Sequence, residues 1–125
     1  MKLVDTSVAV DHLRGYASAV VLLEGLVEAR EELLASELTR YELRAGVRAK
    51  ETGALSRFFT ALTWVPVDAE IAEAGGDLAR RYRKTHPTID DVDYLIAGTA
   101  VLTGAELLTL NVRHFPMFVE LQAPY

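Results

Sequence analysis

Short apolar runs alternate with longer amphipathic stretches along the chain. The apolar runs predict buried β-strands, and the longer stretches repeat their apolar residues at helical spacing. The expected strands cover residues 2–5, 32–36, 63–67 and 106–110, with a short fifth strand at 118–121. The expected helices cover residues 6–14, 17–30, 37–52, 54–62, 69–84 and 89–102.

Capping residues mark where these helices are expected to begin and end. Short polar side chains accept hydrogen bonds from the free N–H groups of a first turn, and glycine commonly ends a helix. The expected N-terminal caps are Thr6 or Ser7, Ser36, Asp68 and Thr88. The expected stops are Gly15, Gly53 and Gly104.

This alternation of strands and helices predicts an α/β fold with βαβ crossovers. The sheet should be mostly parallel, with four to five strands and helices on both faces. The 125 residues fit one domain, residues 1–125, since domains of this size build a single core. Ligands of such sheets bind outside the carboxyl ends of the strands, so acidic side chains at those ends are the first candidates for chemistry.

Three acidic residues occupy positions that the pattern otherwise gives to apolar side chains. Asp5 ends the first apolar run, and Glu42 and Asp93 fall within apolar helix faces. The neighbours of Glu42 on its face are Leu38, Ala45, Gly46 and Ala49, and those of Asp93 are Ile89, Ile96, Ala97, Ala100 and Gly104. A buried carboxylate must be protonated, paired or bound to a metal. Three that converge at one sheet edge indicate an oxygen-ligand site for a hard cation.

Each acid also has a simpler explanation that the pattern leaves open. Asp5 could cap the following helix. Glu42 could pair with an inward arginine or lysine, and Asp93 could be a first-turn acid favoured by the helix dipole.

Composition excludes several other classes of function. The net charge of −5 is the wrong sign for a simple electrostatic binder of nucleic acid, although an enzyme can neutralise its acids locally with cations. Without cysteine there is no disulfide framework or thiolate metal site. No apolar run is long enough to span a membrane, and no secretory signal pattern opens the chain, so we expect a cytoplasmic protein. A glycine-rich phosphate loop is absent.

Four segments together resemble the PIN-domain proteins, and most closely the VapC-like toxins of bacterial type II toxin–antitoxin pairs. The segments are LVDTSVAVDHLRG from Leu3, TRYELRAG from Thr39, DYLIAGTA from Asp93 and LLTLNVRHFPMF from Leu107. The resemblance implies an α/β/α sandwich, RNA endonuclease activity that depends on Mg²⁺ or Mn²⁺, a homodimer, and an antitoxin partner encoded beside the toxin. Asp5, Glu42 and Asp93 match the first three acids of the family.

The chain departs from the family near its end. Many relatives carry an aspartate where this chain has Asn111, and some carry an acid where it has His114. An asparagine supplies an oxygen but no charge, which argues against a tightly held second metal ion. We expect Asp5 and Asp93 as direct metal ligands and Glu42 as a water-mediated ligand or general base. The supporting residues are expected to be Thr6, Ser7, Asp90 and Asn111.

Two other functions compete with a toxin ribonuclease. A degenerate PIN module would bind RNA or protein without cleavage, and Asn111 is the feature that favours it. A phosphoacceptor signalling domain would need a lysine after its last strand, and none follows Lys84. The basic run of Arg80, Arg81, Arg83 and Lys84 is interpreted as a solvated helix end, with contact to RNA phosphates as the alternative. His114 could act as a general acid.

Overall fold

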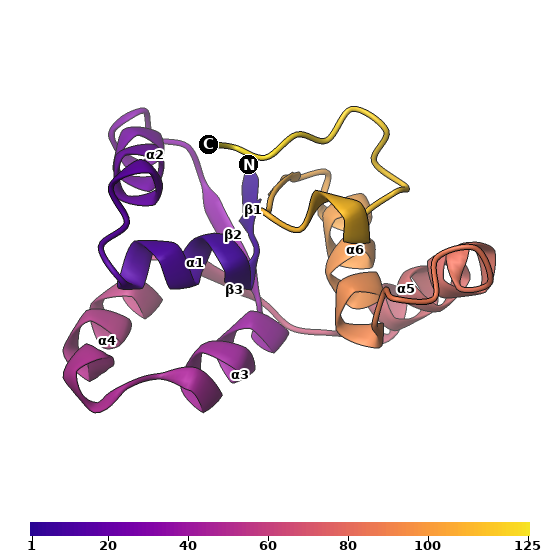
Figure 1. The fold of residues 1–125 in the computed structure, drawn as a ribbon, viewed down its shortest axis with the longest axis horizontal. Coiled ribbons are helices and arrows are strands. Elements are labelled where there is room, and N and C mark those ends of the chain that lie inside the picture. The colour runs from indigo at the N-terminus through magenta and orange to yellow at the C-terminus, as the bar shows by residue number, and fades with distance from the viewer.

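A computed structural model describes all 125 residues as a parallel sheet enclosed by helices (Figure 1). The strands are β1 (Lys2–Val4), β2 (Leu33–Ser36), β3 (Thr63–Val65) and β4 (Glu106–Leu108), in the order β3-β2-β1-β4. All three strand pairings are parallel. The α-helices are α1 (Thr6–Leu13), α2 (Ala17–Glu28), α3 (Glu37–Gly46), α4 (Thr52–Ala61), α5 (Ala69–Tyr82) and α6 (Asp91–Thr103). Two 3₁₀ turns are η1 (Ala49–Glu51) and η2 (Val112–His114).

The sheet separates two hydrophobic cores, as the predicted three-layer α/β/α arrangement requires. Figure 1 shows α1, α2 and α4 on one side of the sheet and α5 and α6 on the other. Successive strand residues point to opposite faces, so Val4 packs with Phe58 on the α1 side whereas Leu3 packs with Ile96 on the α6 side. The fold class predicted from the sequence is therefore confirmed.

The carboxyl ends of the strands bring distant segments to one edge of the sheet. β1 runs directly into Asp5, whose backbone N–H donates to the Leu108 carbonyl at 3.0 Å. β4 continues into Thr109, and β2 passes through Ser36 into α3, where the Ser36 hydroxyl caps the helix by accepting from Leu38 N. Residues from three strand ends thus meet at this edge.

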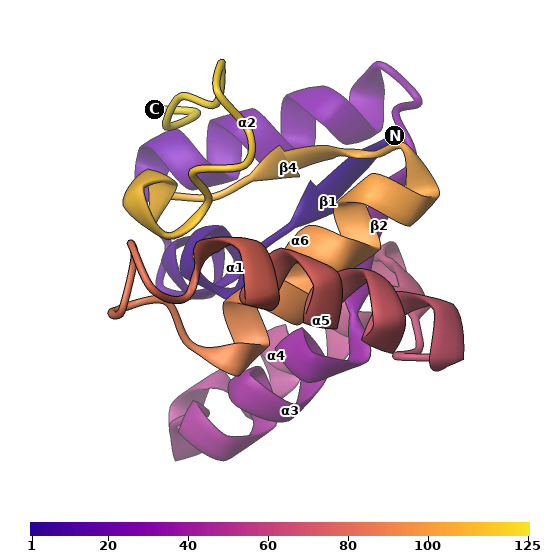
Figure 2. The same ribbon diagram turned by 90° about the vertical axis from the view of Figure 1, so that its right-hand side faces the viewer.

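Helices α5 and α6 lie side by side (Figure 2), and glycines allow their close approach. A Cβ atom on Gly98 would lie 2.9 Å from Gly75 N and 3.1 Å from Ile71 O. One on Gly75 would lie 3.1 Å from Tyr94 O. These contacts leave no room for a larger residue and hold α6 close against α5.

Several predicted helix boundaries were wrong. Helix α4 begins at Thr52, so the expected stop Gly53 lies inside it, and α2 and α5 each end two residues earlier than expected. Helix α3 ends at Gly46 and not at residue 52, because Val47 adopts an extended conformation and packs against the α1-side core. Helix α6 begins at Asp91 with Asp90 as its cap, and not at residue 89, because Ile89 is buried against Ala79. Asp5, rather than Thr6 or Ser7, holds the cap position of α1.

The expected fifth strand at residues 118–121 does not form. The chain turns there instead, with Phe118 N donating to Phe115 O and Leu121 N to Phe118 O. Both apolar side chains pack against the α6-side core, so these residues are buried without pairing as a strand.

Among the helices, none combines the length and the apolar character that a membrane span requires.

Candidate metal centre

Asp5 is a buried carboxylate at the carboxyl edge of the sheet, 5% exposed. Its Oδ2 accepts hydrogen bonds from the Thr109 hydroxyl at 2.7 Å and the Ser7 hydroxyl at 3.2 Å. Although Asp5 holds the cap position of α1, its side chain makes no cap hydrogen bond. The simple capping explanation for this acid is therefore excluded, and its Oδ1 has no hydrogen-bonding partner in the protein.

The two hydroxyls that contact Asp5 are themselves fixed by backbone groups. The Thr109 hydroxyl accepts from Asn111 N and the Ser7 hydroxyl accepts from Leu110 N, each at 3.0 Å. Each hydroxyl is thus an acceptor for the main chain and a donor to the carboxylate, an arrangement that uses its hydrogen-bonding capacity and orients Asp5.

Glu42 lies half-buried on α3 and reaches back to the start of α1. Its Oε1 accepts from the Thr6 hydroxyl at 2.7 Å, and that hydroxyl also lies 3.2 Å from the Thr39 hydroxyl. No arginine or lysine pairs with Glu42, which excludes the ion-pair explanation.

The predicted face of α3 was partly wrong. The buried residues of α3 are Thr39 and Leu43, and Glu42 flanks them, whereas Ala45, Gly46 and Ala49 are exposed. The helix turns away from the core at Gly46, so the apolar stripe assumed for residues 45–49 does not exist. On another face of α3, the Arg40 guanidinium lies 4.2 Å from the centre of the Trp64 ring.

Asp93 lies in the first turn of α6, with its side chain 13% exposed. The pKa of this carboxyl is raised to about 6, chiefly by burial and also by the nearby Asp90 and Asp5 carboxylates, while His114 opposes the shift. His114 Nδ1 is 2.9 Å from Asp93 Oδ2. The repulsion from Asp5 shows that acids from β1 and α6 share one region.

Apart from the contact of His114 with Asp93, the three acids have no basic partner. None of Asp5, Glu42 and Asp93 pairs with an arginine or lysine. No three histidine, aspartate, glutamate or cysteine side chains stand close enough to hold one metal ion together. Mg²⁺ usually takes one or two carboxylates and completes its shell with water, so it does not need a cluster of three protein ligands.

Of the four supporting residues predicted from the sequence, two contact the acid side chains directly and two do not. Thr6 and Ser7 contact the acids as described above. The exposed Asp90 accepts from Asp93 N at 2.9 Å and so caps α6. Asn111 is exposed, and its side chain makes no hydrogen bond. Sequence analysis did not identify Thr109, because a threonine beside a predicted strand carries no distinguishing signal.

The basic run at the end of α5 is partly paired. Arg80 contacts Asp77 and Arg83 contacts Asp91, at 3.2 and 3.0 Å. Both pairs are largely exposed, so each contributes little to stability. These two guanidiniums are engaged with surface acids rather than with the three candidate ligands.

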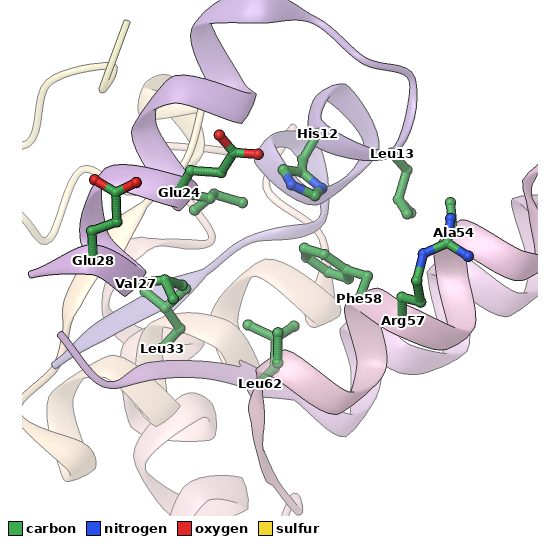
Figure 3. Close-up of a pocket in the computed structure, with 12 residues that line it drawn as sticks. His12, Leu13, Glu24, Val27, Glu28, Leu33, Ala54, Arg57, Phe58 and Leu62 are labelled. Atoms are coloured by element: carbon green, nitrogen blue, oxygen red, sulfur yellow. The ribbon is translucent and has the colours of Figure 1, made fainter. Parts of the chain in front are cut away.

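A separate apolar groove of about 460 Å³ lies between α1, α2 and α4 (Figure 3). Leu33, Phe58 and Leu62 line its apolar wall. Glu24 and Glu28 stand on the α2 side and Arg57 on the α4 side. His12 also lines the groove. Burial lowers the pKa of His12, with partial opposition from Glu24.

Comparison with known proteins shows that the chain is similar to PIN-domain ribonucleases. The PIN domain family model matches residues 2–117. Ribonuclease VapC19 of Mycobacterium tuberculosis is 61% identical over 125 residues, covering 100% of both chains. Ribonuclease VapC10 of the same species is 41% identical over 127 aligned residues, covering 100% of this chain and 93% of that protein.

Solved structures share the same fold. A toxin–antitoxin complex from Klebsiella pneumoniae contains a chain with 25% identity and a TM-score of 0.77, covering 100% of this chain and 98% of that one. A chain of VapBC2 from Rickettsia felis, solved with a promoter DNA fragment, has a TM-score of 0.81 at 22% identity, covering 93% and 91%. The second similarity concerns the fold alone.

Proposed function

The chain belongs to the PIN domain family, and on this premise we propose that it is an Mg²⁺- or Mn²⁺-dependent endoribonuclease, the toxin of a toxin–antitoxin pair. The observation that carries the proposal is that Asp5 and Asp93 lie near each other at the carboxyl edge of the sheet, with Glu42 bonded to Thr6, the residue after Asp5. No arginine or lysine neutralises any of the three acids. Two relatives that match this whole chain are ribonucleases by name. The proposed place of action is the cytoplasm, where RNA is available.

Asp5 and Asp93 are the proposed direct ligands of the metal. Asp5 offers Oδ1, because its Oδ2 is occupied by the Thr109 and Ser7 hydroxyls. The raised pKa of Asp93 reflects burial and neighbouring carboxylates, and a cation would relieve both by stabilising the charged form. When bound, the metal supplies an acidified water molecule and neutralises charge on the scissile phosphate.

Glu42 is proposed to act on the attacking water. The Thr6 hydroxyl donates to Oε1 and so fixes the carboxylate. Oε2 makes no hydrogen bond within the protein, which leaves it to accept a proton from water. General bases of this kind typically contribute about 10² to 10⁴ in rate.

The proposed protein partner is an antitoxin that occupies the groove between α1, α2 and α4. Solved relatives with this fold include a toxin–antitoxin complex. The lining favours a segment with apolar side chains on one face, a basic residue beside Glu24 and Glu28, and an acidic residue beside Arg57. The homodimer implied by the family remains a prediction, which sedimentation of the free chain would check.

Substitution of the acids tests the enzymatic proposal. Asp5→Ala and Asp93→Ala should each abolish RNA cleavage in Mg²⁺ or Mn²⁺, because each removes a direct ligand. Asp91→Ala is the matched control, since Asp91 lies in the same first turn of α6 but points to solvent and pairs with Arg83. Activity of either ligand variant within about threefold of the parent, a barrier change under about 0.7 kcal/mol, would refute the assignment.

A PIN module that binds without cleaving is the second candidate. It is favoured by Asn111, which brings no charge to a position where relatives carry an acid and which has no side-chain hydrogen bond. RNA binding by the parent chain without any new RNA ends in Mg²⁺ or Mn²⁺ would support this alternative.

A further inference from the structure

His114 is the only side chain that hydrogen-bonds to the Asp93 carboxylate. Its Nδ1 lies 2.9 Å from Asp93 Oδ2. The other hydrogen bond at Asp93 runs from its backbone N to Asp90 and does not involve the carboxylate. His114 is therefore placed to determine how Asp93 is oriented.

The backbone of His114 is fixed by the surrounding structure. Its backbone N donates to Asn111 O at 2.9 Å within η2. The next residue, Phe115, is 1% exposed in the α6-side core and stacks on Phe118. The imidazole itself is 36% exposed, so it does not fill space in the core. A rigid turn thus presents a partly solvated ring to one carboxylate.

The charges around Asp93 explain why such a contact matters. Asp90 and Asp5 both repel this carboxylate, and no arginine or lysine restrains it. With its proton on Nδ1, His114 donates to Oδ2 and leaves Oδ1 without a partner. Groups that hydrogen-bond a metal ligand in this way fix its orientation, and their loss commonly lowers metal affinity about 10- to 100-fold.

We propose that His114 is a positioning residue for metal binding, which holds Asp93 by its Oδ2 so that Oδ1 is free for the divalent cation. This inference rests on the proposed function, because it assumes that Asp93 is a metal ligand. Asn111, close to His114 in the chain, adds no charge to the site. Metal binding would therefore depend more strongly on a correctly oriented Asp93 carboxylate.

Calorimetric titration of the full chain with Mn²⁺, without RNA, tests the proposal. His114→Ala should bind Mn²⁺ about tenfold more weakly than the parent. His114→Asn should recover affinity to within about threefold, because its amide can donate to the same carboxylate. His86→Ala is the matched control, since the His86 imidazole hydrogen-bonds to Thr85, lies against the Tyr82 ring and does not contact the acids. Its Mn²⁺ affinity should equal that of the parent.

The outcomes separate this inference from the proposed function. Loss of binding in Asp93→Ala together with parental or tighter binding in His114→Ala would overturn the positioning role alone. Failure of His114→Asn to recover affinity would also overturn it. Absence of Mn²⁺ binding by the parent would remove both the metal site and the role of His114. If His114→Ala does not fold in EDTA, the pair His114→Leu and His114→Gln, without and with a donor, replaces it.

Discussion

Asp93 shows the cost of burying a carboxylate close to other carboxylates. Its pKa is raised to about 6 in the folded chain, against about 3.9 for an aspartate in an unfolded chain. The folded state therefore holds a proton more tightly than the unfolded state does. The contribution of Asp93 to stability is fully present below the unfolded value and is lost as the pH rises through about 6. At neutral pH the charged Asp93 carboxylate is thus a source of instability.

The variant Asp93→Asn should accordingly stabilise the metal-free protein. In EDTA at pH 8, we expect its free energy of unfolding to exceed that of the parent by about 1 kcal/mol, a value reduced for solvent screening of a partly exposed group. At pH 4 the difference should nearly vanish, because Asp93 is then protonated in the folded parent. Denaturant unfolding at several pH values measures the effect. A gain that is equal at pH 4 and pH 8 would show that it does not arise from the charge.

At this scale the sequence identified the acids but not the groups that orient them. Asp5 and Asp93 could be identified because a carboxylate in an apolar run contradicts its surroundings. Thr109 could not, although it donates to Asp5 from 104 positions away, because a hydroxyl is compatible with either a core or a surface position. The contact between His114 and Asp93 likewise depends on how η2 packs against α6. Such contacts arise from tertiary packing and cannot be inferred from local sequence.

Whole elements were predicted well where one local signal determined them and less well where packing competed. The cap of α5 at Asp68 and the stop of α6 at Gly104 have the expected form, since Asp68 accepts from Ile71 N and Gly104 has a φ of 71°. The end of α3 was misplaced because burial of Val47 outweighs the helical pattern that continues beyond it. The contact of Val47 with the core could not be predicted from the spacing of apolar residues along the sequence.

The contact between α5 and α6 provides a test at the scale of elements. Gly98→Ala should destabilise the protein by about 1 to 3 kcal/mol, because its Cβ would lie 2.9 Å from Gly75 N. Gly76→Ala is the matched control, since Gly76 is exposed on α5 with nothing near its Cβ position. It should gain about 0.5 to 1 kcal/mol from helix propensity. Thermal unfolding measures both, and equal effects of the two substitutions would contradict the close approach.

Across the whole molecule, α1 connects the two surfaces that the proposed function requires. Its first residues, Thr6 and Ser7, contact the acids Glu42 and Asp5. Its last residues, His12 and Leu13, line the apolar groove. Since a helix rises about 1.5 Å per residue, the two ends of this segment are about 10 Å apart. An antitoxin seated in the groove would therefore lie close to the proposed catalytic edge, while the acids themselves would be unchanged.

This separation predicts that antitoxin binding and RNA cleavage can be uncoupled. Val27 lines the groove with 54% of its surface exposed, so Val27→Asp should leave the fold intact while placing a charge against the partner's apolar face. We expect affinity for the product of the adjacent reading frame to fall at least about tenfold, or about 1.4 kcal/mol, with RNA cleavage unchanged. Val21→Asp, on the same helix at 71% exposure but outside this groove, should retain the parent's affinity. If both variants bind the antitoxin as the parent does, the partner occupies another surface, and the acids would have to be blocked from there.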